Sequence, residues 1–481
     1  MRIPYILSVI GALVCCLGLA MLFPLGFAIY YGDSSVVPLI ISIGITLGLG
    51  AFAMLALRND SAPVLSHREG IAIVALGWLA AGLFGALPFI VAGEMTPTDA
   101  VFESISGFTT TGASILTDIE SVPKGLLMWR SLTHWLGGMG IIVLSLAILP
   151  FLGVGGMQLY KAEVPGPTPD KLKPRIKDTA VMLWRVYVML SVAQAVLLMF
   201  GGMNLFDSIC HTFGTLATGG FSTRNTSIAA YDSAYIDWVI ILFMFLAGMN
   251  FSLHFRLLRG DVMSLLRDSE FRFYAVVILL FTVIITFCVW DNNYESVWTS
   301  LRMAAFQVVS ICTTTGYATA DYEVWLPLAQ VLLFFLMFLG GSAGSTGGGM
   351  KCMRVLVLLK QGYHELLQLV HPRAVKRVKL GGRLVPPDVL SGVVGFFILY
   401  LLLYVLSAFV MAALGMDVLT SFASVAACIG NIGPGLGTVG PAENYAHIPM
   451  MGKWVLAFDM LLGRLEIYTV IILFVPEFWR K

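Results

Sequence analysis

The chain has 481 residues, of which 58% are hydrophobic and 12% are charged, and its mean hydropathy is +0.87. Soluble domains carry about 25% charged residues, so this composition excludes a soluble globular protein and indicates an integral membrane protein. The 29 basic and 28 acidic residues give a net charge of +1, which offers no support for a nucleic-acid partner. The seven cysteines form no CxxC pair and predict neither a disulfide framework nor a metal site.

Two long apolar runs open the chain, near 3–30 and 36–57. About 20 apolar helical residues cross a bilayer, so both runs predict transmembrane helices. The first run is longer than a signal-peptide core and lacks a small-residue cleavage site, so we expect it to be retained. We assign 1–66 to two N-terminal transmembrane helices that stand outside the repeats described next.

Eight further apolar runs follow, with shorter semi-apolar stretches between alternate pairs. The runs lie near 71–92, 127–153, 179–202, 235–258, 272–290, 324–370 (interrupted), 389–414 and 450–476. The shorter stretches are 100–108, 207–215, 298–311 and 419–429. They are too short to cross a bilayer, and each ends at a glycine signature. The sequence therefore predicts ten spans and four short re-entrant helices.

The four glycine signatures are TGA at 111–113, TGG at 218–220, TGY at 315–317 and IGP at 432–434. At membrane depth, irregular backbone is tolerated only where it is buried in protein or lines a watery cavity, so each signature predicts a pore loop. Glycine lets successive carbonyls point inward, where they replace the water shell of a cation, and neighbouring side-chain oxygens can add to them. The predicted ion-binding residues are Thr110, Thr111, Gly112, Thr218, Gly219, Gly220, Thr314, Thr315, Gly316, Asn431, Ile432 and Gly433.

The signatures also define a repeat. With Gly112, Gly219, Gly316 and Gly433 as equivalent points, the unit recurs at spacings of 107, 97 and 117 residues. Four such units close a ring, as four chains do in a tetrameric pore. We therefore predict an all-α integral membrane fold with four M1-P-M2 pore-loop repeats in a pseudo-four-fold arrangement. The expected repeats are 67–160, 161–262, 263–372 and 373–481.

The run 324–370 is interrupted by the sequence GGSAGSTGGG at 340–349. Six glycines in ten residues destabilise a helix, so we expect a loop inside the membrane below the filter. The stretch fails the phosphate-loop pattern because Cys352, not Ser or Thr, follows Lys351, and we reject nucleotide binding here. A plain kink that lets helices pack closely is the alternative.

Arg464 lies near the centre of the run 450–476. An arginine at that depth costs at least about 2.5 kcal/mol unless it faces a cavity or a partner. We expect it to face the pore and to donate to carbonyls of the loop 340–349, with a structural ion pair to Asp459 or Glu466 as the alternative. The predicted gate residues are Gly344, Ser345, Thr346, Gly347, Gly348, Gly349, Lys351 and Arg464.

The distribution of basic residues predicts the orientation. With both termini in the cytoplasm, 22 basic residues fall inside, among them Lys351 and Arg354, and five fall outside, among them Arg130 and Lys453. All four glycine signatures then open toward the outer side. Outer acidic residues such as Glu103 are expected either to attract cations or to form an ordinary solvated face.

Six motifs together carry a family resemblance: TTTGAS at 109–114, ATGGFST at 217–223, TTTGYAT at 313–319, GGSAGSTGGGMK at 340–351, NIGPGLG at 431–437 and LGRLEI at 462–467. On these motifs the chain resembles the Trk/Ktr/HKT superfamily of potassium transporters, most closely its TrkH-type bacterial membrane subunits, over nearly its whole length.

The resemblance implies a potassium uptake pathway in the bacterial inner membrane, a homodimer, and a cytoplasmic ring of RCK-type regulatory subunits that bind nucleotide. In the family, serine in place of the first filter glycine goes with sodium transport, so Gly112 favours potassium. The fourth loop departs from the Thr-x-Gly pattern with Asn431, which weakens the expectation of four equal coordinating loops.

Gated, channel-like potassium uptake is therefore the leading function. A proton- or sodium-coupled potassium symporter and the pore subunit of a primary potassium pump are the alternatives, although the chain has no DKTGT-like phosphorylation sequence. No constellation of nucleophile, base and metal predicts an enzyme. Potassium is the only bound ion expected, with no organic cofactor, and membrane lipid is the expected surrounding.

Overall fold

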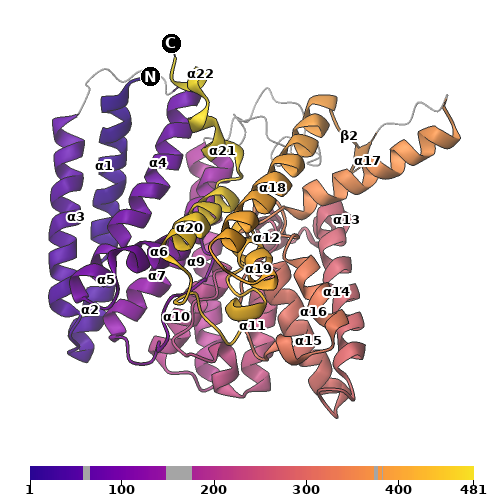
Figure 1. The fold of residues 1–481 in the computed structure, drawn as a ribbon, viewed down its shortest axis with the longest axis horizontal. Helices are drawn as coiled ribbons and strands as arrows, with labels where there is room; N and C mark the ends of the chain where they lie inside the picture. Colours follow the sequence, from indigo (N-terminus) through magenta and orange to yellow (C-terminus); the bar gives the residue numbers. More distant parts are fainter. Residues whose placement is uncertain (58–65, 148–175, 373–377, 382, 481) are drawn as a thin grey trace.

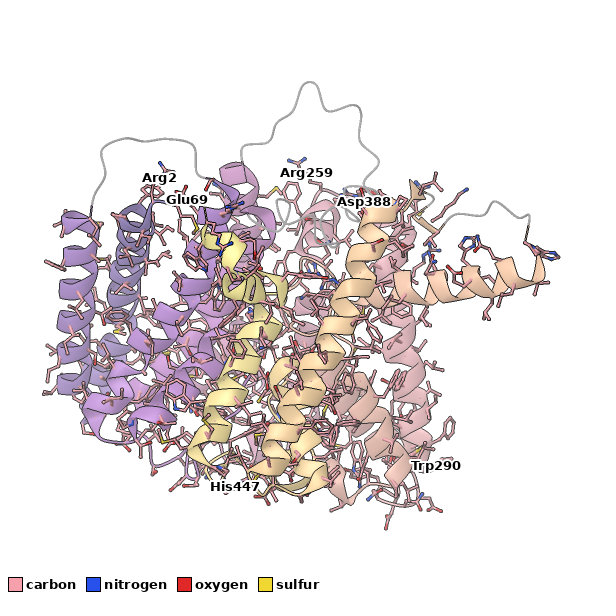
Figure 2. The ribbon with its side chains drawn as sticks, turned by 45° about the horizontal axis from the view of Figure 1, so that its top comes forward. Arg2, Glu69, Arg259, Trp290, Asp388 and His447 are labelled. Carbon is pink, nitrogen blue, oxygen red and sulfur yellow. The ribbon has the colours of Figure 1, made fainter. Side chains whose placement is uncertain are left out.

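The computed structural model describes residues 1–57, 66–147, 176–372, 378–381 and 383–480, which form a bundle of helices (Figure 1). The N- and C-termini lie at the same end of this bundle. Figure 2 places Arg2, Arg259 and Asp388 toward that end and Trp290 and His447 toward the other. The only strands in the described ranges are β1 (Lys379–Leu380) and β2 (Arg383–Leu384), which pair antiparallel.

The N-terminal helices are α1 (Ile3–Ala20), α2 (Leu22–Tyr31) and α3 (Val36–Ala56). They are apolar on every face, as expected of membrane spans. The α1 and α3 backbones approach closely because glycines face each other: a Cβ added to Gly11 would lie 2.7 Å from the Gly50 carbonyl oxygen. These helices stand beside the repeats at one edge of the bundle in Figure 1, as the sequence predicts.

Each repeat opens with a long apolar helix. These first helices are α4 (His67–Gly85), continued by α5 (Leu87–Ala92), then α9 (Ile176–Phe200), α14 (Ser269–Val289) and α18 (Pro387–Ala413). The start of α4 is fixed by a capping box, in which Ser66 accepts from the Glu69 N–H and the Glu69 side chain accepts from the Ser66 N–H.

Four short helices follow the first helices, as the sequence predicts. They are α6 (Pro97–Phe108), α10 (Leu205–Leu216), α15 (Val297–Cys312) and α19 (Val418–Ile429). Thr96, Asn204 and Asp417 cap three of them by accepting a backbone N–H of the first turn. Although α6 carries several polar residues, it is buried throughout 100–108, so other helices enclose it on all sides.

The second helices of the repeats are mostly broken. They are α7 (Lys124–Ala147), α11 (Ala234–Ala247) with α12 (Phe251–Leu258), α16 (Pro327–Leu336) with α17 (Cys352–Val370), and α20 (Met450–Arg464) with α21 (Tyr468–Ile471). α11 and α12 meet at a bend of 103°. In Figure 1, α17 projects away from the bundle.

These breaks correct the expected count of ten spans, of which only 324–370 was expected to be interrupted. Among the described residues, six helices are long and apolar enough to cross a membrane, or seven if the bent pair α11 and α12 is one span. The runs expected at 127–153, 324–370 and 450–476 do not give such a helix there. The last two are divided by non-helical backbone, and the end of the first lies outside the described residues.

The remaining elements connect these helices. They are η2 (Ser227–Tyr231), α13 (Val262–Arg267), η3 (Tyr322–Val324), η4 (Gly437–Val439), η5 (Ile472–Phe474) and α22 (Pro476–Trp479). With them, the described chain consists of two N-terminal spans and four units of helix, short helix, loop and second helix, and the second helix is broken in the last three units. This is the predicted architecture of four M1-P-M2 repeats.

Candidate ion pathway

The four short helices end in loops with the same hydrogen-bond pattern. In each loop one backbone N–H donates to the carbonyl five residues earlier, at 2.8 or 2.9 Å. The pairs are Thr111 to Ser106, Gly219 to Gly214, Thr315 to Ser310, and Ile432 to Ala427. The chain therefore makes the same turn four times, although the four loop sequences differ.

Backbone dihedrals repeat as closely as the hydrogen bonds. The first turn residue has a positive φ in every loop: Thr110 (51°), Thr218 (54°), Thr314 (61°) and Asn431 (54°). Two residues later a glycine is also left-handed: Gly112 (81°), Gly220 (79°), Gly316 (79°) and Gly433 (99°). A non-glycine residue in this region costs on the order of 1–3 kcal/mol and persists only where its surroundings impose it. The three threonines take this conformation although a positive φ is readily open only to glycine.

This dihedral pattern corrects the register of the second loop. The sequence aligns Gly219 with Gly112, Gly316 and Gly433, but the left-handed glycine of this loop is Gly220. Gly219 instead occupies the position of Thr111, Thr315 and Ile432, and the glycine spacings become 108, 96 and 117 residues. The TGG sequence offers two adjacent glycines, so only the backbone geometry identifies the equivalent one.

The left-handed glycines join the four loops into a closed ring. A Cβ added to Gly112 would overlap the carbonyl oxygen of Gly219, the middle residue of the next loop. In the same way Gly220 meets the Thr315 oxygen, Gly316 meets the Ile432 oxygen, and a Cβ on Gly433 would lie 2.7 Å from the Thr111 oxygen. Each repeat thus touches the next at one equivalent point, and the fourth touches the first. Any side chain at these glycines would push adjacent repeats apart.

The ring contains carbonyl oxygens at equivalent positions in all four loops, and such rings replace the hydration shell of a cation in channel filters. Threonine hydroxyls are largely committed elsewhere. Thr111 pairs with Thr109 and Thr315 with Thr313, both at 2.8 Å, and Thr218 donates to the Ala217 oxygen at 2.6 Å. All twelve predicted ion-binding residues lie in these loops, and the backbone rather than the hydroxyls offers the repeated oxygens.

A buried ion pair braces the first two loops. Arg130 of α7 donates through Nε to Glu103 of α6 at 2.6 Å, and both side chains are at most 3% exposed. Glu103 also accepts from the Ser114 hydroxyl and the Ile115 N–H, both at 2.9 Å. Arg130 additionally donates to the Ser222 oxygen in the second loop at 2.9 Å. Glu103 and Arg130 are expected on the outer side, Glu103 either attracting cations or lying on a solvated face; both are instead buried and bond to each other behind the ring of loops.

The other three repeats also place a polar residue where the first has Glu103, and in two of them it bonds its own loop. In the second repeat His211 bonds Ser222 of its own loop at 2.9 Å. In the third, the Gln307 amide lies against the backbone of Thr319 and Ala320. In the fourth the position is Ser424, whose hydroxyl donates to Ser421 of the same helix at 3.4 Å. In three repeats, therefore, a polar side chain of the short helix bonds the loop that follows that helix.

Residues 337–351 form an ordered loop between α16 and α17. The Thr346 hydroxyl lies 3.0 Å from the Leu216 oxygen and 3.2 Å from the Ala247 oxygen, at the ends of α10 and α11. The Gly348 N–H donates to Thr314 of the third glycine loop at 2.7 Å, and Lys351 donates to the Gly347 oxygen. A plain kink would not reach three other elements, so this segment is a separate loop that touches the ring of glycine loops.

Arg464 lies against this loop. Its Nη1 donates to the Thr346 oxygen at 2.5 Å and its Nη2 to the Gly137 oxygen of α7 at 2.9 Å. The side chain is 2% exposed and its Cζ lies 5.9 Å from the centre of the Trp78 ring. The expected contact with the loop 340–349 is thus present. The alternative ion pairs are absent from the described contacts, because Asp459 bonds Ser407 and Glu466 pairs with Arg354.

The chain also breaks directly after Arg464, which the sequence did not predict. α20 ends at Arg464, and Glu466 and Ile467 have φ values of 58° and 51°. Glu466 leaves the helix to pair with Arg354, which also lies 4.0 Å above the Phe396 ring. Arg464 is therefore at the C-terminal end of a half-helix, where unsatisfied carbonyls favour a positive charge, and not at the centre of a continuous span.

Several charges that the sequence places in loops are buried. Arg354 is 1% exposed and Lys351 is 7% exposed, so neither belongs to a cytoplasmic loop. Lys453 bonds Asp99 at 2.6 Å. Hydropathy alone cannot pair residues so distant in sequence. The available signal was an ionisable residue inside or beside an apolar run, which by default has a buried partner or a function.

The fold and the ring define a class: an all-helical membrane protein in which one chain carries four pore loops around a common centre. The TrkH family model, described as cation transport protein, matches residues 41–481, and the chain belongs to this family. It is 46% identical over 481 residues to the Trk system potassium uptake protein TrkH of Salmonella typhimurium and 45% identical to that of Escherichia coli K12. Each alignment covers 99% of both proteins.

A solved structure is similar over the whole chain. It is the crystal structure of the potassium transporter TrkH from Vibrio parahaemolyticus, with a TM-score of 0.92, 39% sequence identity and coverage of 100% of both chains. Agreement at this level covers all four repeats and the two N-terminal spans.

Proposed function

We propose that the chain takes up potassium across the bacterial inner membrane through a gated, channel-like pore. The observation that carries the proposal is the ring in which each left-handed glycine meets a carbonyl of the next loop. Potassium is favoured because relatives at 45–46% identity are named potassium uptake proteins. In this proposal 67–160, 161–262, 263–372 and 373–481 each supply one quarter of the filter, and the twelve predicted loop residues bind the ion.

The proposed driving force is the membrane potential, which contributes about 2.3 kcal/mol per charge per 100 mV. No enzymatic step and no organic cofactor are needed. The proposed orientation has both termini in the cytoplasm. It is supported by the position of both termini at the same end of the bundle in Figure 1. The excess of basic residues on the cytoplasmic side also remains when the buried residues Lys351, Arg354 and Arg130 are left out of the count.

The proposed gate consists of residues 344–349, Lys351 and Arg464. Arg464 donates to the Thr346 and Gly137 carbonyl oxygens, so it ties the loop 344–349 to α7, a helix of the first repeat. The same loop also bonds the proposed filter. A fixed positive charge beside the pathway also repels a permeant cation. Displacement of Arg464 would free the loop and remove this charge.

The gate is tested by Rb⁺ uptake into liposomes that contain the purified chain. Arg464→Ala removes two charge-assisted hydrogen bonds, each worth about 1.5–3 kcal/mol, so basal uptake should rise about tenfold or more. Arg464→Lys keeps the charge without the forked donors, so its basal uptake should lie between that of the wild type and that of Arg464→Ala. Arg259→Ala, at an exposed position, is the control. Basal uptake equal in Arg464→Ala and Arg259→Ala refutes the gate.

The same liposomes test the ion and the coupling. Uptake should be inhibited by K⁺ far better than by Na⁺ or Li⁺, and it should continue without a proton gradient. Indifference to K⁺ would overturn the assignment of the ion. A strict need for a proton or sodium gradient would favour the symporter, and uptake that needs ATP and a second subunit would favour the pore subunit of a pump.

We further propose a homodimer that binds a nucleotide-binding RCK-type subunit at its cytoplasmic end. Support comes from the family, whose members here are named as parts of a Trk system. Light scattering of the detergent-solubilised chain tests the dimer: a mass near the 52.3 kDa of one chain contradicts it. A purified RCK-type subunit with nucleotide should change Rb⁺ uptake, and an unchanged rate contradicts that partner.

A further inference from the structure

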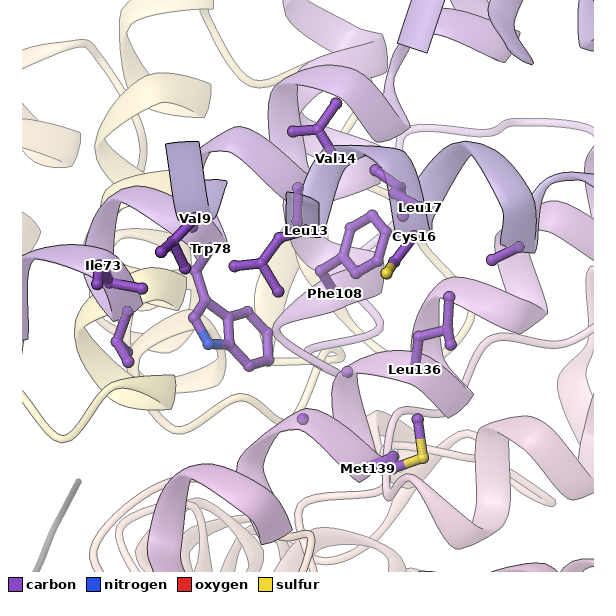
Figure 3. Close-up of a pocket in the computed structure, with 16 residues that line it drawn as sticks. Val9, Leu13, Val14, Cys16, Leu17, Ile73, Trp78, Phe108, Leu136 and Met139 are labelled. Carbon is purple, nitrogen blue, oxygen red and sulfur yellow. The ribbon is translucent and has the colours of Figure 1, made fainter. Parts of the chain in front are cut away.

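A cavity of about 500 Å³ lies among the membrane helices α1, α4, α6 and α7. Its walls are apolar and include Leu13 and Leu17 of α1, Trp78 and Ala81 of α4, Phe108 of α6 and Leu136 of α7. Figure 3 shows Leu13, Trp78 and Phe108, from three different helices, around the same space. A cavity with such walls excludes water and accepts apolar molecules, and its volume is that of a ligand site.

The side of α1 that borders the cavity also reaches the outer surface of the bundle. Leu13 is 49% exposed and Cys16 is exposed, and both lie in the first membrane span. At this depth the surrounding medium is hydrocarbon. An apolar chain from the bilayer can therefore enter beside α1 without crossing polar surface, whereas a polar ligand would lose hydrogen bonds that these walls cannot replace.

Three wall residues also lie next to the proposed ion pathway. Phe108 is the last residue of α6, directly before the first filter loop. The Gly137 carbonyl accepts from Arg464 at 2.9 Å, and the Trp78 ring lies 5.9 Å from the same guanidinium. Gly137 also packs directly on the Phe108 carbonyl, so closely that a Cβ there would overlap it. Whatever fills the cavity therefore packs against the backbone that holds Arg464.

We propose that one acyl chain of a membrane phospholipid binds in this cavity. By packing on Trp78, Phe108 and the Gly137 backbone, it keeps the carbonyl that receives Arg464 in place and so favours the closed gate. Binding of the acyl chain follows from the cavity alone. Its effect on flux rests on the gate proposed above.

Binding is tested by fluorescence of the full chain in nanodiscs of phosphatidylcholine with or without bromine in the middle of its acyl chains. The contribution of Trp78, one of ten tryptophans, is the difference between the wild type and Trp78→Phe. Brominated lipid should quench most of the Trp78 fluorescence. Ala81→Phe fills the cavity from α4 and should abolish that quenching. Ala80→Phe, a neighbour outside the cavity walls, should leave the quenching unchanged.

Ala20→Phe fills the cavity from α1 and replaces Ala81→Phe if the latter does not fold. Quenching that is equal in the filled variants and in Ala80→Phe overturns the binding site, because Trp78 would then sense only lipid at the bundle surface. Absence of any quenching of Trp78 overturns it as well.

The effect on the gate is tested by Rb⁺ uptake in two lipids. Methyl-branched phytanoyl chains fit the cavity less well than straight chains, so they should raise the basal uptake of the wild type and of Ala80→Phe. Uptake of Ala81→Phe should not depend on the lipid. If the quenching result holds but wild-type uptake is the same in both lipids, the regulatory effect is refuted. If Arg464→Ala also leaves uptake unchanged, the gate itself has failed instead.

Discussion

The buried pair Glu103–Arg130 allows a quantitative test of how the ring of glycine loops is held. Glu103→Gln preserves the size of the side chain and an acceptor for the Ser114 hydroxyl, but it leaves Arg130 at 3% exposure without a counter-charge. Breaking a buried pair in this way costs about 3–5 kcal/mol. We expect the lower end of this range, because Arg130 keeps the Ser222 carbonyl at 2.9 Å and the Phe221 ring at 3.5 Å.

The free energy of unfolding of each variant would be measured by denaturant titration in bicelles, alongside the Rb⁺/Na⁺ uptake ratio. Glu120→Gln is the matched control, since Glu120 and its partner Arg224 are 48% and 39% exposed and such a pair is worth about 1 kcal/mol or less. The double variant Glu103→Gln/Arg130→Met removes both charges and should cost less than the sum of the single variants. Equal costs for Glu103→Gln and Glu120→Gln, or strict additivity, would refute the reasoning.

Three further predictions concern the ring, the loop and a helix cap. Gly220→Ala should lower Rb⁺ uptake at least about tenfold, because it combines overlap with the Thr315 oxygen and a left-handed φ; Gly362→Ala, with open space around it, should not. Thr346→Val loses a buried hydrogen bond worth about 0.5–1.5 kcal/mol, so basal uptake should rise several-fold, and an unchanged rate contradicts a closed loop held by this hydroxyl. The pKa of Asp417 is lowered chiefly by its hydrogen bonds with Thr420, so its cap stabilises α19 fully above the unfolded pKa of about 3.9 and is lost as pH falls through the lower folded pKa. The melting temperatures of wild type and Asp417→Ala should therefore differ at pH 7 and converge in acid.

The sequence was sufficient for the features that depend on local pattern. Apolar runs and glycine signatures predicted the N-terminal spans, the four short helices and the loops. They could do so because the membrane interior allows few backbone conformations that leave no polar group unpaired. The sequence was insufficient for features that depend on contacts between residues far apart in the chain. Gly219 and Gly220 are indistinguishable until the backbone of the neighbouring repeat selects one. Likewise the break after Arg464 depends on Glu466 reaching Arg354, a residue 112 positions away.

Asn431, the residue by which the fourth loop departs from the others, has a different role in the structure from the one its position suggests. Like Thr110 in the first loop it is left-handed, a conformation that asparagine tolerates better than threonine. Its amide nitrogen bonds the Thr111 hydroxyl and the Met460 oxygen, both at 2.9 Å. Met460 lies on α20, four residues before Arg464. One amide thus joins the first glycine loop to the helix that carries the proposed gate residue by donating to both, whereas a threonine hydroxyl has one hydrogen and can donate to only one of them.

Asn431→Thr separates the two roles of this residue. If the amide mainly links filter and gate, the substitution should raise basal Rb⁺ uptake, because α20 loses its bond to the filter, while the Rb⁺/Na⁺ ratio stays near that of the wild type. If the amide mainly coordinates the ion, the ratio should change and the basal rate should not. The contacts favour the first outcome, since both hydrogen bonds of the amide nitrogen go to protein oxygens. A changed ratio with an unchanged basal rate would therefore contradict the link.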